Sequence, residues 1–262
     1  MRIPDYILDG LFSWPGLGFN EYTIYMLVRY HRPASIDDLV TKSSLGRHRV
    51  VRACRILAKA GWLNLIKQGR TIRPVGAVPT VLQEKMIAEL KTRLSMAQFK
   101  GEFLLKSALD LWVDSDNFVD NARPPFLINP LTDEPLEIDR YYPEDRVGIE
   151  YNGAQHYRMT EIHADEKAFR TAQSHDLMKL ALCVKNGVTL VIVTNTDLSL
   201  KGIRRLLPPK LRLNAVNLDE PYARALEDLL SSYRRKAARK AKSDCVRPAE
   251  MMAGNGTQLS QE

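Results

Sequence analysis

Two acidic residues near the middle of the 262-residue chain have types and spacing that suit metal-dependent chemistry. Asp139 lies in the strand-like run LEIDRYY and Glu150 in VGIEY, and the PEDR between them favours a turn, so the sequence predicts a hairpin. Two carboxylates that converge from adjacent strands are costly to bury unless a divalent cation neutralises them. Mg²⁺ and Mn²⁺ prefer such oxygen ligands, and the bound cation can hold a phosphate and activate a water molecule. The pair therefore predicts a metal site for phosphate chemistry.

Further polar residues could work beside these two acids. Gln155 and His156 follow the second acid in the run NGAQHY. A nearby Gln, His or Lys would orient a water molecule or hold a phosphate. Asp176 and Lys179 lie one turn apart on one face of a predicted helix. Glu102 stands on an otherwise apolar face of an earlier predicted helix and is the last candidate.

Each candidate also has an ordinary structural alternative. Glu150 favours function most strongly, because an unpaired acid in an apolar strand destabilises the fold. Asp139 directly precedes Arg140, so a salt-bridge role is the alternative for this acid. An exposed or packed position without a function is the alternative for the other candidates, Glu102, His156, Asp176 and Lys179.

The elements that must position these residues predict an α/β domain over residues 100–208. A helix ending near Trp112 precedes the two strands, and a longer helix after them closes on Gly187. The apolar run TLVIVT, residues 189–194, is typical of a buried central strand. A final helix stops before Pro208. This order predicts a mixed sheet covered by helices.

The motifs of this domain resemble the PD-(D/E)XK restriction-endonuclease-like superfamily. Two segments carry the resemblance, IDRYYPEDRVGIEYNGAQHY (138–157) and DLMKLALCVKNGVTLVIV (176–193), with a Glu in the helix ahead of them. The likeness is greatest to the very-short-patch-repair branch, which includes the EDxHD homing endonucleases. That branch shows Glu, Asp, a variable position, His and Asp, which fall here on Glu102, Asp139, Glu150, His156 and Asp176. The resemblance implies a restriction-endonuclease-like core with a mixed sheet, with Mg²⁺ or Mn²⁺ as cofactor.

The resemblance also implies roles for single residues. The two hairpin acids, Asp139 and Glu150, would be the metal ligands, and Glu102 would be an outer ligand of the metal or of a water molecule. Gln155 or His156 would orient the phosphate or the water. Asp176 would orient the histidine or residues that surround the metal ligands.

One position departs from the family pattern. The superfamily places a lysine two residues after the second acid, and this chain has Asn152 there. Lys179 on the following helix could reach the site instead, as relocated lysines do in some relatives, and Gln155 could equally take the role. The group that activates water is therefore left open.

Residues 1–78 resemble a winged helix-turn-helix domain of the α+β class. A helix over residues 21–31 with Asn20 as its N-cap is followed by a short helix capped by Ser35 and by the basic helix RHRVVRACRILAKAG. The β-like runs WLNLI and TIRPV, joined by KQGR, complete the pattern. In such a domain the basic helix would lie in the major groove and the hairpin along the neighbouring backbone. The expected DNA-binding residues are Arg47, His48, Arg49, Arg52, Lys67, Arg70 and Arg73.

Charge favours nucleic acid as the partner of this first domain. Residues 39–83 contain no acid, and residues 1–75 carry a net charge of +7, equal to that of the whole chain. A basic stripe on a compact element is the footprint of phosphate binding. The alternative is that this winged-helix domain binds another protein instead of DNA. Trp62 and Ile66 are expected to fill the core beneath the hairpin rather than to touch DNA.

The remaining charge is divided between an acidic middle and a basic end. Residues 110–166 carry a net charge of −10 and residues 167–262 a net charge of +8. A helix over residues 79–113 is expected to link the two domains, with a bend or break at Gly101. A basic helix is expected within residues 209–242, either to clamp DNA or to solubilise the chain. Residues 243–262 are polar and are expected to be disordered.

Composition excludes several classes of protein. No run of about 18 apolar residues exists, which excludes a membrane-spanning helix, and no secretory signal is recognised. The cysteines, Cys54, Cys183 and Cys245, are too far apart for a disulfide framework or a zinc knuckle. A cytoplasmic location is expected, nucleoid-associated in a bacterium or in the host cell if the gene belongs to a phage.

These patterns together predict a Mg²⁺-dependent endodeoxyribonuclease that a winged-helix domain directs to double-stranded DNA. A DNA-binding regulator whose nuclease fold has lost activity is the main alternative, supported by Asn152. An RNA-processing nuclease is a third. Nicking by a monomer and double-strand cleavage by a homodimer are both left open.

Overall fold

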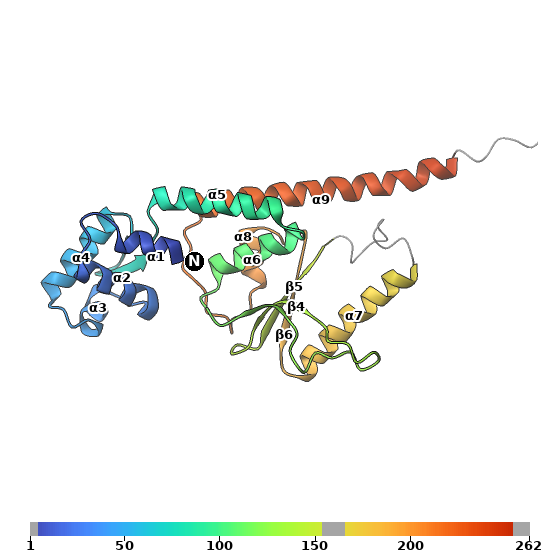
Figure 1. The fold of residues 1–262 in the computed structure, drawn as a ribbon, viewed down its shortest axis with the longest axis horizontal. Helices are drawn as coiled ribbons and strands as arrows, with labels where there is room; N and C mark the ends of the chain where they lie inside the picture. The colour runs from blue at the N-terminus through green and yellow to red at the C-terminus, as the bar shows by residue number, and fades with distance from the viewer. Residues whose placement is uncertain (1–4, 154–165, 254–262) are drawn as a thin grey trace, which may run out of the picture. The chain divides into compact units, whose positions relative to one another are not determined.

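The computed structural model describes residues 5–153 and 166–253 of the chain (Figure 1). These residues form two compact units, Ile3–Thr92 and Arg93–Glu262. The division falls inside a helix of the segment that was expected to link two domains. Gln155 and His156 lie outside the described residues, so the structure says nothing about them.

The first unit consists of a helical cluster and a β-hairpin. Its helices surround a core of Tyr25, Leu39, Leu57 and Trp62, each of which is fully buried. Tyr25 packs edge-on against Trp62, with ring centroids 5.4 Å apart. The elements are α1 (Asp5–Phe12), α2 (Phe19–His31), α3 (Ile36–Lys42), α4 (Arg47–Lys59), β1 (Leu63–Gln68), β2 (Thr71–Gly76) and α5 (Thr80–Met96).

The caps of this unit are partly those that the sequence predicted. Ser35 caps α3, because its hydroxyl accepts a hydrogen bond from the Asp38 N–H at 3.1 Å. The prediction for α2 was wrong, since that helix begins at Phe19 after Gly18. Glu21 reaches back to accept a hydrogen bond from the Gly18 N–H at 3.0 Å, and this places Asn20 inside the first turn.

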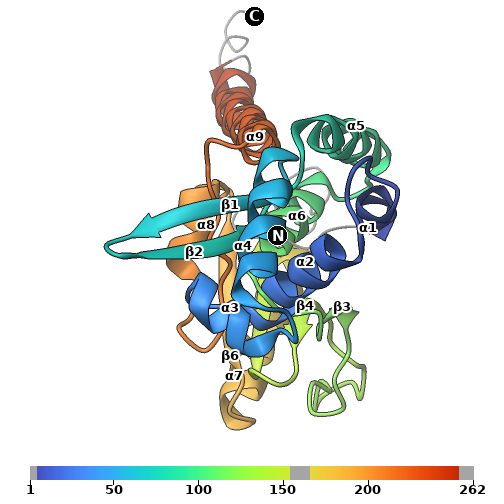
Figure 2. The same cartoon turned by 90° about the vertical axis from the view of Figure 1, so that its left-hand side faces the viewer.

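The hairpin projects away from the helices of its unit (Figure 2). Its strands pair antiparallel from Leu63 and Gly76 at the base to Gln68 and Thr71 at the turn. Trp62, at the base, is buried as predicted, but the prediction for Ile66 was wrong, because 42% of its surface is exposed. Ile66 lies halfway along the arm, where no helix covers it.

The second unit is a four-stranded mixed sheet with helices, in agreement with the predicted α/β class. The strand order is β3-β4-β5-β6, with β3, β4 and β5 antiparallel and β6 parallel to β5. Its elements are α6 (Lys100–Trp112), β3 (Val119–Ala122), β4 (Ile138–Tyr142), β5 (Val147–Asn152), α7 (Glu166–Lys185), β6 (Thr189–Thr194), α8 (Leu200–Leu206) and α9 (Pro221–Ala253).

Two features of this unit differ from their sequence predictions. The strand at 189–194 is not central, because β6 ends the order of the described strands and most of it is only half-buried. Its apolar side chains pack against α7 and α8 instead. The C-terminal helix α9 extends to Ala253, past residue 243, where the sequence analysis expected the disordered tail to begin.

The predicted break near Gly101 is confirmed. α5 ends at Met96 and α6 begins at Lys100. A β-carbon on Gly101 would lie 2.2 Å from the ring of Tyr151, so only glycine allows α6 to approach β5 this closely. None of the helices in residues 5–153 and 166–253 is long and apolar enough to span a membrane.

Candidate active site

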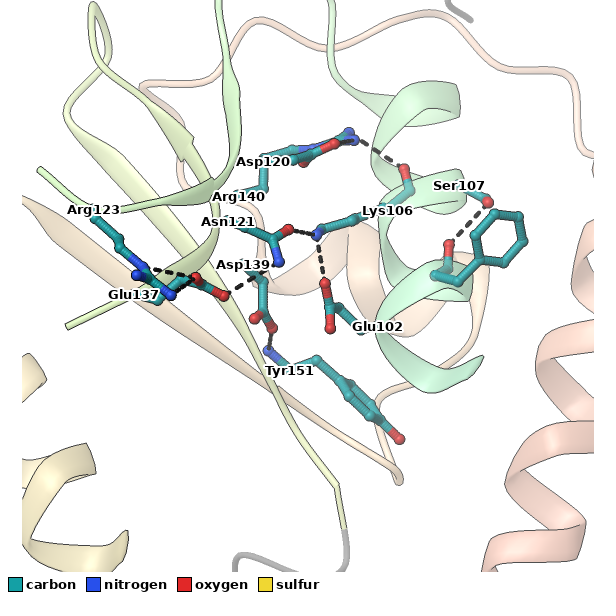
Figure 3. Close-up of polar contacts among 11 residues, drawn as sticks. Glu102, Lys106, Ser107, Asp120, Asn121, Arg123, Glu137, Asp139, Arg140 and Tyr151 are labelled. Atoms are coloured by element: carbon teal, nitrogen blue, oxygen red, sulfur yellow. Dashed lines mark hydrogen bonds and ion pairs between the residues drawn. The ribbon is translucent and has the colours of Figure 1, made fainter. Parts of the chain in front are cut away.

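Asp139 and Glu150 lie opposite one another on neighbouring strands. The antiparallel register pairs Arg140 with Ile149. Asp139, which precedes Arg140, therefore lies opposite Glu150, which follows Ile149. Asp139 Oδ2 accepts a hydrogen bond from the backbone N–H of Tyr151 at 2.7 Å (Figure 3). Glu150 is only 7% exposed. The predicted hairpin therefore brings both acids to one place in the sheet.

Burial makes ionisation of both acids unfavourable. It raises the pKa of Asp139 to about 7, and the charge of Glu150 adds to the effect, while the Tyr151 N–H opposes it. Burial also raises the pKa of Glu150, and the nearby ammonium of Lys179 opposes that rise. A positive charge between the two carboxylates would relieve both penalties.

Lys179 on α7 forms an ion pair with Oε1 of Glu150. The structure thus brings the lysine of the following helix to the acid, at the place where the sequence left a relocated lysine as one option. Asp176, one turn earlier, lies close enough for its charge to raise the pKa of Glu150. Asn152, two residues after Glu150, is 4% exposed and has an uncharged amide side chain.

Two buried oxygens at this site have no hydrogen-bond partner among the described residues. They are Oε2 of Glu150 and Oδ1 of Asn152. A buried acceptor without a donor costs about 1–3 kcal/mol, so such atoms are rare in folded proteins. Both atoms lie on β5, and a ligand with positive charge or donor groups would satisfy them.

Glu102 on α6 completes the group of acids around Asp139. Its charge raises the pKa of Asp139, and the ammonium of Lys106 lowers it. Lys106 Nζ lies 2.5 Å from Glu102 Oε1 and 2.5 Å from Asn121 Oδ1 (Figure 3). The sequence predictions omitted Lys106 and Asn121. The i,i+4 spacing from Glu102 was a signal for Lys106, whereas nothing in the sequence indicates that Asn121 has a left-handed φ of 53°.

Arg140 joins α6 to the sheet beside these acids. Its guanidinium donates to Asp120 at 2.7 and 3.1 Å and to Asp110 Oδ1 at 2.7 Å, and it stacks over the Phe118 ring at 4.0 Å. A further hydrogen bond of 3.3 Å reaches the backbone oxygen of Lys106. The alternative in which Asp139 serves as the salt-bridge partner of Arg140 is therefore wrong, because Asp110 and Asp120 fill that role.

The donor set of the site fits Mg²⁺ or Mn²⁺. Within residues 5–153 and 166–253, no group of three or more His, Cys, Asp or Glu side chains could hold a metal. Mg²⁺ in phosphoryl-transfer sites commonly takes one or two carboxylates and completes its shell with water and substrate phosphate. Asp139 and Glu150 supply two carboxylates, and the unpartnered Oε2 of Glu150 is available to a cation.

The raised pKa of Asp139 predicts how pH affects stability without metal. The folded state keeps a proton on Asp139 up to about pH 7, whereas an unfolded chain releases it near pH 4. Folding stability from this group therefore falls as pH rises from 4 to 7 and is level above that. Differential scanning fluorimetry in EDTA should show this fall, and Asp139→Asn should flatten it.

Metal binding should have the opposite pH dependence. A cation competes with the proton on Asp139, so added Mg²⁺ should raise the melting temperature more at pH 8 than at pH 5.5. An equal rise of the melting temperature with Mg²⁺ at pH 5.5 and pH 8 in wild type would count against a metal at this carboxylate. The same rise in Asp139→Asn as in wild type would also count against it.

The basic residues of the first unit lie mostly on its surface. Arg47, His48, Arg49 and Arg52 are exposed along the N-terminal half of α4. Lys67 and Arg70 are exposed on the hairpin, and Arg73 is half-buried. One of these cations is already paired, since Arg47 forms an ion pair with Asp37 of α3.

Comparison with known proteins finds relatives in viruses. The chain is 43% identical over 97 residues to uncharacterized protein 307L of Invertebrate iridescent virus 6, which covers 35% of this chain and 48% of the relative. It is 43% identical over 76 residues to uncharacterized protein 033L of Invertebrate iridescent virus 3, covering 29% and 39%. Uncharacterized protein 094L of Frog virus 3 is 32% identical over 81 residues, covering 30% and 52%.

These similarities are partial. The chain spans about half the length, or less, of each of these relatives. No family model matches the chain, and no solved structure matches it significantly. The chain is thus similar over about a third of its length to proteins of iridescent viruses and of Frog virus 3.

Proposed function

We propose that the chain is a metal-dependent DNA endonuclease whose second unit hydrolyses phosphodiester bonds. The observation that carries the proposal is the Asp139–Glu150 pair on adjacent strands, in which Glu150 is buried. One oxygen of Glu150 has no hydrogen-bond partner among the described residues, and Lys179 lies at the other. The order of helix α6, three antiparallel strands, α7 and a parallel β6 also supports a restriction-endonuclease-like core.

Residues of the chain would divide the work. Asp139 and Glu150 would hold Mg²⁺ or Mn²⁺, which when bound would supply a Lewis acid and an activated water molecule. Lys179 would hold a phosphate oxygen or the attacking water, since its ammonium lies beside Glu150. Glu102 would be an outer ligand of the metal or of a water molecule. Lys106 keeps that carboxylate in position through an ion pair.

The first unit would deliver this site to duplex DNA as a winged helix. Helices α2, α3 and α4 followed by a hairpin, with exposed cations on α4 and on the hairpin, support this. We further propose that the protein acts in the infected host cell, because its relatives are viral. Whether a monomer nicks or a dimer cuts both strands stays open.

Incubation of purified protein with supercoiled plasmid tests the proposal. Nicked or linear DNA should form with Mg²⁺ or Mn²⁺ and not with EDTA. Absence of cleavage of both plasmid and single-stranded DNA in either metal would contradict it. Cleavage of RNA in place of DNA would favour an RNA-processing nuclease, the third alternative from the sequence.

A DNA-binding regulator without activity is the second candidate. Asn152 favours it, because the family's lysine is missing there, and the Lys179–Glu150 ion pair could be purely structural. This candidate predicts duplex binding that neither requires metal nor leads to cleavage.

Both candidates require α4 to bind DNA, which gives a separate prediction. Arg49→Ala/Arg52→Ala removes two exposed cations from α4. Duplex affinity at 150 mM salt should fall by at least about tenfold. The slope of log K against log salt should become less steep by about 2, because each lost phosphate contact reduces its magnitude by about 0.9. Fluorescence anisotropy with a labelled duplex measures both.

The matched control removes charge from a different helix. Lys85→Ala/Lys91→Ala takes the same number of exposed cations from α5 and should alter the slope by less than about 0.5. Equal losses in the two variants would show that net charge alone, and not α4, controls binding.

A further inference from the structure

The C-terminal helix α9 is fixed to the unit that carries the acids. Its first turns bury Ala223, Leu226 and Leu230, and α9 packs against α6. Glu227 Oε2 accepts a hydrogen bond from the Leu200 N–H at 2.7 Å, which ties α9 to the start of α8. Residues that follow Leu230 on the same helix therefore have a defined place beside this unit.

Tyr233 is where α9 meets the candidate active site. Its side chain hydrogen-bonds with that of Tyr151, which lies directly after Glu150 on β5. The Tyr151 hydroxyl also donates a hydrogen bond to Asn195 Oδ1. The N–H of the same Tyr151 binds Asp139. One residue thus connects α9 to the acid pair.

A cluster of cations begins immediately after Tyr233. Residues 229–243 contain no acid, and six cations fall within residues 234–242, namely Arg234, Arg235, Lys236, Arg239, Lys240 and Lys242. Arg235, Lys236 and Arg239 are exposed and Arg234 is half-buried. No described residue forms an ion pair with these four. Other arginines of the unit do have acidic partners, such as Arg212 with Asp114 and Arg224 with Asp219.

Unpaired like charges on one helix repel each other. Arg235 and Arg239 are four residues apart, a spacing at which like charges destabilise a helix. A polyanion would remove this repulsion. The residues between the cations are alanines, and the segment RRKAARKAK has no large apolar side chain. A helix that lies on a membrane needs such side chains on its other face, so the composition favours a nucleic-acid backbone over lipid.

We infer that residues 234–239 of α9 form a phosphate-binding surface that flanks the candidate active site and holds the DNA strand next to the bond to be cut. This inference rests on the proposed nuclease function. A helix rises about 1.5 Å per residue, so the cations from Arg234 to Arg239 extend about 9 Å from Tyr233, which is the length of about three base pairs. The surface therefore contacts phosphates within about half a helical turn of the cleavage position.

Neutralising the surface tests the inference. Arg234→Gln/Arg235→Gln/Lys236→Gln/Arg239→Gln should lower the slope of log K against log salt by about 2–4 and weaken duplex binding at 150 mM salt at least tenfold. Binding is measured by anisotropy in EDTA, where no cleavage occurs. The control Lys85→Gln/Lys91→Gln/Lys185→Gln/Lys201→Gln has the same change of charge and should lower the slope by less than 1. Circular dichroism verifies that both variants fold.

A crosslink reports where the surface lies on DNA. Lys236→Cys carrying a photoreactive group should crosslink within about four base pairs of the cut made by wild type. Unchanged salt dependence in the quadruple variant would overturn the inference, and so would crosslinks spread evenly along the duplex. Binding of wild type to anionic vesicles that the quadruple variant loses, with DNA affinity intact, would also overturn it.

Failure of the inference and failure of the proposed function give different results. If plasmid is never cut but the quadruple variant loses its salt slope, α9 binds DNA and the nuclease proposal fails. If wild type cuts plasmid and the variant keeps its slope, the nuclease proposal stands and the inference about α9 fails.

Discussion

Replacing Glu150 by Gln, or Asp139 by Asn, is expected to lower the rate of plasmid cleavage by at least about a thousandfold, or about 4 kcal/mol of transition-state stabilisation. Each change keeps the size of the side chain and removes one of the two charges that would hold the metal. Single-turnover cleavage with saturating Mg²⁺ measures the rate. Duplex binding in EDTA should stay within about threefold of wild type, because the basic surfaces are untouched.

The two variants should differ in stability even though both lose activity. Asp139→Asn removes a charge that lies near Glu150 and Glu102, so the metal-free protein should melt at the same temperature as wild type or higher. Glu150→Gln leaves the ammonium of Lys179 without its carboxylate and should lower the melting temperature. Opposite changes in melting temperature are expected where a site keeps charged side chains for function although they destabilise the fold.

A nearby acid supplies the control for both variants. Glu134 is exposed in the segment before β4, where its carboxylate accepts a hydrogen bond from the Thr132 hydroxyl at 3.2 Å. Glu134→Gln should leave the cleavage rate within about twofold of wild type. If Glu150→Gln or Asp139→Asn retains more than a tenth of the activity, the acid pair is not the metal site.

The acid pair could be predicted from sequence because its determinants are local. Alternating strand patterns around Asp139 and Glu150, with a turn between them, predict a hairpin, and a hairpin places its strands side by side. No tertiary information is needed for this step. A break near Gly101 was likewise predicted, and it falls just before that glycine, between Met96 and Lys100.

Contacts between distant elements could not be predicted in the same way. The sequence left open whether Lys179 reaches the site, since the answer depends on the rotation of α7 against the sheet. Asn121 meets Lys106 through a left-handed backbone conformation that no local pattern indicates. Ile66 was expected in the core because it is apolar, but burial of a hairpin residue depends on whether a helix covers it.

Arg140 is the residue of the second unit whose loss should destabilise the fold most. It is 3% exposed, and it binds Asp110 of α6, Asp120 of β3 and the backbone of Lys106 at the same time. Removing the guanidinium leaves two carboxylates facing each other across a partly buried space. Breaking such a pair from one side costs about 3–5 kcal/mol. The Asp side chains are 38% and 40% exposed and can regain water, so the lower end of this range applies.

Arg140→Leu is therefore expected to lower the free energy of unfolding by about 3 kcal/mol, measured by urea denaturation. Arg140→Lys keeps the charge but loses the planar fork that binds Asp120 twice, and about half of the loss should remain. Arg224→Leu is the comparison, because its ion pair with Asp219 is largely exposed and should contribute less than about 1 kcal/mol. A loss below 1 kcal/mol in Arg140→Leu would mean that packing of Phe118 and the helix, not this charge network, holds α6 and its Glu102 against the sheet.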